Sequence, residues 1–258
     1  MDTDLRFAVS TLGLRKDFGK IKAVDGLDLE VEAGSFFGFL GPNGAGKSTT
    51  IRILTGMLLP TAGTASVLGH DIVDDPVAAK KLMGVVSEDG AVFTRLSGAE
   101  YLEFVGRMYG MDRATIRDRS KELLELMDLA ADASKLVVDY SHGMQKKLGF
   151  AAALIHNPRI LFLDEPFEGI DAISGRLIKA VLSQLRRSGV TIFLTSHILE
   201  IVEKLCSEIA IIHHGRIVAM GTLDQLRSET AAGSSLEELF LDLVAKGTAE
   251  DRPLSWLD

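Results

Sequence analysis

The length, composition and charge of the chain limit the classes of protein to which it can belong. Its 258 residues, 47% of them hydrophobic, are enough for one sizeable core or for one domain with a subdomain. A formal net charge of −8 argues against a protein that binds nucleic acid mainly through its phosphates, so we expect no nucleic-acid partner. The single cysteine, Cys206, allows no internal disulfide and is typical of a reducing compartment.

Nothing in the sequence predicts secretion or membrane insertion. The first ten residues, MDTDLRFAVS, include acidic residues where a secretory signal has a basic start and an apolar centre. No apolar run approaches the ~20 residues that a transmembrane helix needs. We therefore expect a cytoplasmic chain that contacts a membrane only through a partner.

The first third of the sequence predicts antiparallel strands and then a strand–turn–helix unit. Within residues 5–32, apolar and acidic residues alternate from Leu27 to Glu32, which is the period of a half-buried strand. The elements predicted next are a strand over 35–40, a glycine-rich turn with a helix that stops at Gly56, a strand over 64–68, a helix with proline at its first position, Pro76, and a strand over 84–87.

From residue 88 the pattern becomes helical and then returns to alternation. The spacing of Ser97 and Glu100 is that of a capping box, and no strand pattern occurs before Ile160, which predicts a helical insert over about 90–157. The elements predicted after the insert are a strand over 160–164, a helix over 174–187, a strand over 190–195, a helix over 198–205, two strands around residues 213–216 and an amphipathic helix over 236–244.

This order predicts an α/β protein with a mostly parallel sheet and helices on both faces. We expect one domain over residues 1–230, which contains the helical subdomain, and a C-terminal helix and tail over 231–258. The last dozen residues are polar except for Trp256, and we expect them to be loosely held.

The strongest functional motif is the turn GPNGAGKS over residues 41–48, which fits G-x-x-x-x-G-K-[ST]. Its glycines let successive backbone N–H groups surround a phosphate, and the positive end of the following helix points at the same place. Lys47 can reach the β- and γ-phosphates of a nucleotide, and the Ser48 hydroxyl can bind Mg²⁺. The nucleotide-contacting residues that this motif predicts are Gly41, Pro42, Asn43, Gly44, Ala45, Gly46, Lys47, Ser48 and Thr49.

An apolar strand that ends in two carboxylates complements this motif. In ILFLDE, over residues 160–165, Asp164 is suited to hold Mg²⁺, and Glu165 is suited to orient or deprotonate an attacking water. The simpler interpretation is a strand capped by solvated acids, and the phosphate loop makes that interpretation the weaker one.

Three further segments each allow a functional and a structural interpretation. Ser141 can be an ordinary helix cap, or the helix that it begins can present N–H groups to an anion. His197 follows an apolar strand and can contact a γ-phosphate or serve the packing alone. Phe18, in a polar strip, can stack on an adenine or belong to the core of a hairpin.

Together these segments resemble the ATP-binding cassette of ABC transporters, in the correct order over about residues 5–228. Residues 41–49 resemble its Walker A motif, residues 160–165 its Walker B motif with the catalytic glutamate, and YSHGMQ its signature. Residues 168–171, which include Asp171, are similar to the D-loop, His197 to the switch histidine and Phe18 to the aromatic residue that stacks on adenine. The resemblance implies a P-loop NTPase core with an N-terminal antiparallel β subdomain and a helical subdomain.

The resemblance also implies partners. It predicts a head-to-tail dimer, with a copy or with a sister cassette, in which each ATP lies between one Walker A motif and the Ser141–Gly143 signature of the other subunit. It further predicts a transmembrane permease subunit that holds the chain on the inner face of the membrane. Tyr101 and Phe104 look exposed in the sequence, and we expect them to line a docking groove for a helix of that subunit.

The sequence departs from the family at several positions. His142 replaces a glycine, Phe167 replaces a threonine, and Glu88 occupies the place of the Q-loop glutamine. A carboxylate at residue 88 can serve catalysis as a further Mg²⁺ ligand, turn away toward the partner, or be a solvated loop acid with no role. We expect it to turn away in the isolated chain and to swing in when the partner is coupled.

The function that these residues predict is ATP hydrolysis, with ATP and Mg²⁺ bound, by a subunit that powers a separate membrane subunit. The resemblance to cassettes that transport drugs, polysaccharides or lipids favours export. The alternative is an ABC-type ATPase that is not tied to transport and acts in DNA repair, on ribosomes or in cofactor assembly. The coiled-coil insertion or second cassette that is usual in the first two of these groups is absent from the sequence.

Overall fold

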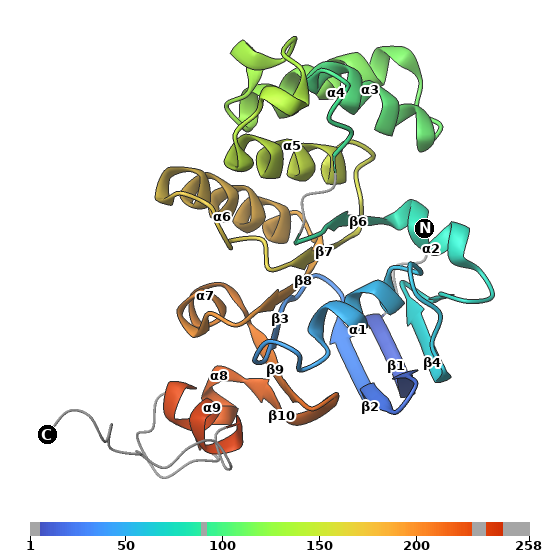
Figure 1. Ribbon diagram of the computed structural model, residues 1–258, viewed down its shortest axis with the longest axis vertical. Coiled ribbons are helices and arrows are strands. Elements are labelled where there is room, and N and C mark those ends of the chain that lie inside the picture. The colour runs from blue at the N-terminus through green and yellow to red at the C-terminus, as the bar shows by residue number, and fades with distance from the viewer. Residues whose placement is uncertain (1–5, 89–91, 229–235, 245–258) are drawn as a thin grey trace, which may run out of the picture.

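Two sheets and a set of helices make up the described residues, 6–88, 92–228 and 236–244, of this computed structural model (Figure 1). The larger sheet has six strands within these residues. Its strand pairings are parallel except for the pairing of β9 with the edge strand β10, which is antiparallel. In spatial order the strands are β10 (Arg216–Thr222), β9 (Glu208–His213), β3 (Phe36–Leu40), β8 (Thr191–Ser196), β7 (Ile160–Asp164) and β6 (Met83–Val86).

The smaller sheet is antiparallel and is built from the N-terminal part of the chain. Its order among the described residues is β2 (Ile21–Glu32), β1 (Phe7–Phe18), β4 (Ala62–Val67) and β5 (His70–Asp71). Along β2 the apolar Leu27, Leu29 and Val31 are buried, and the residues between them are exposed, as the alternation in the sequence predicts.

The helices divide between the two faces of the parallel sheet. Helices α1 (Lys47–Leu54) and α2 (Pro76–Leu82) pack with the antiparallel sheet, whereas the others belong to the opposite core. Those others are α3 (Gly98–Met108), α4 (Arg113–Leu126), α5 (His142–Leu154), α6 (Ala172–Arg187), α7 (Leu199–Leu205), α8 (Leu223–Ser228) and α9 (Leu236–Val244). In Figure 1, α3, α4 and α5 form a separate layer beyond the edge of the sheet at β6.

The central strands are apolar on both faces, so they contribute to two cores at once. Phe36 and Leu40 of β3 face the core of α3–α9, and Phe37 and Phe39 face the core of α1 and the antiparallel sheet. Rings of Phe37, Phe39 and Phe162 lie 5.3–5.5 Å, centroid to centroid, from Phe193. Such burial on both faces is expected for strands of a parallel sheet covered by helices.

The α/β class, the parallel sheet, the antiparallel sheet and the helical insert are confirmed. The capping box at Ser97 is formed, because Glu100 N–H donates to Ser97 and the Glu100 carboxylate accepts from Ser97 N–H. The division at residue 230 stays a prediction, and the polar tail with Trp256 lies outside the described residues. Of the described helices, none has both the length and the apolar character to cross a bilayer.

One prediction about the helical insert is wrong. Tyr101 is buried, with 8% of its surface exposed, because it lies on the inner face of α3 with Leu102. Phe104 is 40% exposed and contacts the exposed Phe93, with ring centroids 5.1 Å apart. The exposed aromatic pair at this place is therefore Phe93 and Phe104.

Candidate active site

The carboxyl ends of three adjacent parallel strands, β3, β7 and β8, bring the predicted site residues together. The phosphate loop follows β3, Asp164 and Glu165 end β7, and His197 follows β8. Ligands of open α/β sheets bind at this edge, because the loops that leave the strands converge there.

The phosphate loop requires glycine at Gly46, immediately before α1. Gly46 has φ = 110°, and a Cβ atom built on it would lie 2.3 Å from the Ala23 carbonyl oxygen. The loop therefore packs against β2 too closely for any other side chain. Lys47 follows with 5% exposure, and its Nζ donates to the Gly41 and Pro42 carbonyl oxygens at 2.7 and 3.2 Å.

Asp164 lies at the centre of a short hydrogen-bonded chain. Its Oδ1 accepts from Ser48 Oγ at 3.2 Å and from Thr195 Oγ1 at 2.6 Å. A carboxylate oxygen and a hydroxyl oxygen side by side are the hard oxygen donors that Mg²⁺ prefers, so these residues fit that ion.

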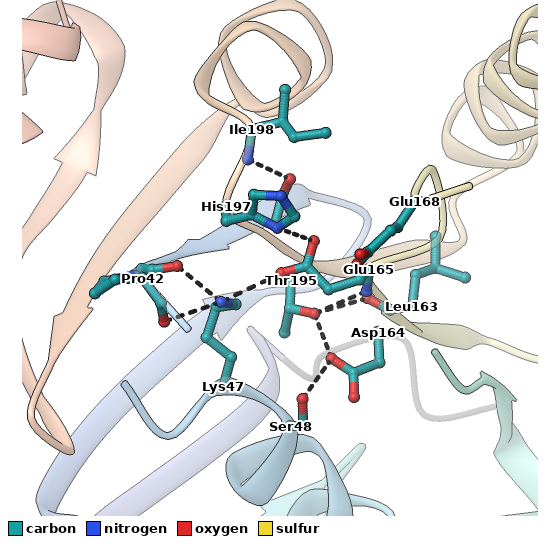
Figure 2. A network of polar contacts seen from close by, with 12 residues as sticks. Pro42, Lys47, Ser48, Leu163, Asp164, Glu165, Glu168, Thr195, His197 and Ile198 are labelled. Carbon is teal, nitrogen blue, oxygen red and sulfur yellow. Dashed lines mark hydrogen bonds and ion pairs between the residues drawn. The ribbon is translucent and has the colours of Figure 1, made fainter. Parts of the chain in front are cut away.

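Glu165 is buried and joins two other site residues (Figure 2). Its Oε1 lies 3.2 Å from Lys47 Nζ, and its Oε2 lies 3.0 Å from His197 Nδ1. Its N–H donates to Thr195 Oγ1 at 3.1 Å, and its backbone has φ = 46°, which is unfavourable for a residue with a side chain. Backbone strain of this kind is common at functional sites, where the surrounding structure holds it in place.

Glu168 belongs to the same cluster, although its carboxylate was not among the predicted site residues. Ligand atoms of Glu165, Glu168 and His197 all lie within 4.8 Å of one another. Figure 2 shows the Glu168 side chain beside Glu165. The sequence signal for it was its place three residues after the Walker B glutamate.

A cavity of about 430 Å³ opens over the phosphate loop. Glu88 lines it together with Lys47 and Glu165, so the prediction that Glu88 turns away in the isolated chain is wrong. The positive charge of the buried Lys146 favours carboxylates at this place, and Glu88 is one of them. The full lining is Ile21, Lys22, Ala23, Asn43, Gly44, Gly46, Lys47, Ser48, Thr49, Glu88, Glu165, Glu168 and His214.

Lys146 connects the helical layer to this site from α5. Its side chain is buried, and Nζ donates to the Glu168 carbonyl oxygen. Burial lowers the pKa of Lys146, and the carboxylates of Glu168, Glu88 and Glu165 oppose that shift. The lysine thus places one positive charge among the acids of the site.

Other predicted residues lie outside the cavity lining. Ser141 caps α5 by accepting from Met144 N–H at 3.3 Å, and it is exposed. Asp171 caps α6 by accepting from Ile173 and Ser174 N–H, and these bonds lower its pKa. Phe18, at the end of β1, is 49% exposed and is therefore not a core residue of the hairpin.

Comparison with known proteins agrees with this geometry. Residues 24–168 match the family model described as "ABC transporter". The chain belongs to the ABC transporter family. Within it, the chain is an ATP-binding subunit that hydrolyses ATP to power a transporter.

Similar members of the ABC transporter family include two from bacteria with named functions. The chain is 40% identical over 97% of its length to the daunorubicin/doxorubicin resistance ATP-binding protein DrrA of Streptomyces peucetius, of which 76% is covered. It is 41% identical over 93% of its length to the Nod factor export ATP-binding protein I of Ralstonia nicotianae, of which 75% is covered.

A solved structure of an ATP-binding subunit of an ABC transporter superposes on the chain with a TM-score of 0.86. It is 29% identical, and the match covers 92% of this chain and 99% of that one. The likeness therefore includes both sheets and the helical layer that lies between residues 92 and 154.

Proposed function

We propose that the chain is the motor subunit of an exporter, that it hydrolyses Mg-ATP and that it closes on a second cassette when ATP binds. The observation that carries this proposal is the buried Glu165, which contacts both Lys47 and His197 over the phosphate loop. The names of its relatives, which describe drug resistance and Nod factor export, support the direction of transport.

In this mechanism each group of the site has one task. The N–H groups of residues 43–49 and Lys47 bind the phosphates, which places the γ-phosphate beside Glu165. Glu165 takes the proton of the attacking water, and His197 orients Glu165 through the 3.0 Å contact. Phe18, at the exposed end of β1, stacks on the adenine.

Ser48, Asp164 and Glu88 would hold the magnesium ion. When bound, the ion offsets the negative charge that accumulates on the phosphates. Thr195 keeps the Asp164 carboxylate in place through the 2.6 Å hydrogen bond, so the donors are already oriented.

The second cassette completes the site with its signature helix. Ser141 and Gly143 begin α5 outside the lining of the chain's own cavity, so they are available to an ATP held by another subunit. The N–H groups at that helix start and its positive end favour a phosphate. Asp171 lies close to this start, because a Cβ on Gly143 would be 3.6 Å from its Oδ2.

The dimer is tested with a variant that keeps the helix cap and adds a negative charge. In a Glu165→Gln background, which retains ATP, light scattering after size exclusion is expected to show a dimer with Mg-ATP and a monomer without it. Adding Ser141→Asp keeps a good N-cap but places a carboxylate against the partner's phosphate, so it is expected to abolish the dimer. Monomers throughout in the Glu165→Gln variant, or a dimer that forms without nucleotide, would contradict the mechanism.

The permease is proposed to dock on the exposed aromatic pair Phe93 and Phe104. These rings are 58% and 40% exposed, and Met108, one turn after Phe104 on α3, is exposed as well. Exposed apolar patches mark interaction sites. Through this contact the chain would lie on the inner face of the membrane. In cells of its source, Phe93→Ser with Phe104→Ser is expected to release the chain from the membrane fraction, whereas Leu12→Ser, at another exposed apolar position, is not. Equal membrane association of all three proteins would refute the docking site.

A further inference from the structure

The turn between β9 and β10 is fastened to the phosphate loop. Gly215 N–H donates to the Ala45 carbonyl oxygen at 2.9 Å, and the Gly215 carbonyl oxygen accepts from Asp25 N–H at 2.9 Å. Arg216 adds two hydrogen bonds to the Asp25 carboxylate, from Nε at 2.9 Å and from a terminal nitrogen at 2.6 Å. The turn therefore holds a fixed position beside the nucleotide cavity.

His214 occupies the exposed corner of this turn with φ = 48°. Glycine and asparagine adopt that conformation at lower cost than most residues, so the turn itself does not require an imidazole. His214 nevertheless lines the cavity that also contains Lys47, Ser48 and Thr49, and its ring lies 4.0 Å, centroid to centroid, from that of His213. An imidazole in that place offers a hydrogen-bonding nitrogen to whatever fills the cavity.

The strand order shows which end of a nucleotide His214 would meet. β3, which leads into the phosphate loop, lies between β8 and β9. Glu165 follows β7, on the β8 side of the loop, and His214 follows β9, on the opposite side. Because Glu165 and the loop fix the γ-phosphate end, the nucleoside must extend toward the other side. Ile21 and Lys22, which follow the β1–β2 turn, also line the cavity.

We propose that His214 is a nucleotide-binding residue that hydrogen-bonds the ribose of ATP. It would act as a contact on the nucleoside, separate from the phosphate-binding backbone of residues 43–49. Lys22, which also lines the cavity, is half-exposed and pairs with Asp25 at 3.5 Å. The imidazole thus raises the affinity for nucleotides, which carry a ribose, and leaves the affinity for inorganic polyphosphates unchanged.

The test compares two ligands on variants that leave the backbone conformation unchanged. Calorimetric titration of the His214→Gly variant is expected to show a Kd for ATP about 3- to 10-fold above that of the parent, the value of one hydrogen bond. Its Kd for inorganic tripolyphosphate is expected to be unchanged. Asn157→Gly, at another exposed left-handed residue outside the cavity lining, is the matched control and is expected to bind ATP as the parent does.

Two results would overturn the inference. An unchanged Kd for ATP in the His214→Gly variant would show that the imidazole does not touch the nucleotide. An equal loss for ATP and tripolyphosphate would show that the turn acts only by shaping the phosphate loop. His214→Asn, which also tolerates positive φ, provides the same comparison should the glycine variant fold poorly. Failure of the parent to bind ATP would contradict the assignment of the cavity itself, which is a different outcome.

Discussion

Replacing Glu165 by glutamine is expected to tighten nucleotide binding while it stops hydrolysis. In the structure Lys47, the lysine that must receive the phosphates, is held by Glu165 at 3.2 Å, and both side chains are buried. At an effective dielectric constant near 20, this pair attracts by about 5 kcal/mol before desolvation is counted. The net value of the pair is smaller, because both buried charges have lost their water and Glu165 Oε1 accepts no hydrogen bond from the lysine.

Glutamine keeps the size of the side chain and offers a neutral oxygen to Lys47, so only part of that net value is lost. A gain of about 1.4 kcal/mol in phosphate binding corresponds to a tenfold lower Kd. Calorimetric titration with ADP in the absence of Mg²⁺ measures this change without hydrolysis. Glu168→Gln removes a neighbouring carboxylate of the same cluster and is expected to change the Kd much less. A Kd for ADP that is equal or higher in the Glu165→Gln variant would refute the reasoning.

Three further predictions concern other buried groups of the chain. Lys146→Met, which removes the anchor of the Glu168 carbonyl, is expected to lower kcat about tenfold at unchanged KM in steady-state hydrolysis. Lys146→Arg is expected to recover part of the loss, and Lys147→Met, on the same helix, is the control that should keep kcat. Burial lowers the pKa of His156, so the unfolded chain binds a proton at this residue more readily than the folded chain does. The free energy of unfolding, measured in urea, is therefore expected to keep its full value above the ordinary histidine pKa and to fall as the pH drops below it. The fall is expected to be smaller in a His156→Phe variant. Burial raises the pKa of the Cys206 thiol, so a thiol reagent at pH 8 is expected to modify it only after unfolding, and rapid labelling of the native chain would contradict this.

The elements and motifs that depend on local pattern could be predicted from the sequence. The capping box at Ser97, the alternation in β2 and the strand–loop–helix unit around Lys47 all depend on neighbours within a few residues, and the structure contains each of them. Helix α6 begins at Ala172, two residues before the expected start, because Asp171 caps it.

The contacts that depend on distant segments could not be predicted. The pairing of Lys47 with Glu165 joins residues 118 positions apart and follows from the order of β3, β8 and β7. Glu88 was expected to turn away because its acidic neighbours were visible in the sequence, whereas the buried Lys146 that attracts it comes from the helical insert. His214 lies in the cavity lining because the next residue, Gly215, hydrogen-bonds to Ala45 and Asp25, and no local motif predicts those bonds.

The two-sided character of the central strands has a consequence for how the site tolerates change. Phe36 and Phe37 are neighbours in the chain but belong to different cores, and the same is true of Phe162 and Leu163. Any movement of the carboxyl end of β3 or β7 must therefore disturb the packing on both faces of the sheet at once. Packing on both faces therefore restrains the strand ends more than packing on one face would. A substitution that loosens the helical layer alone is therefore expected to leave Asp164 beside Ser48.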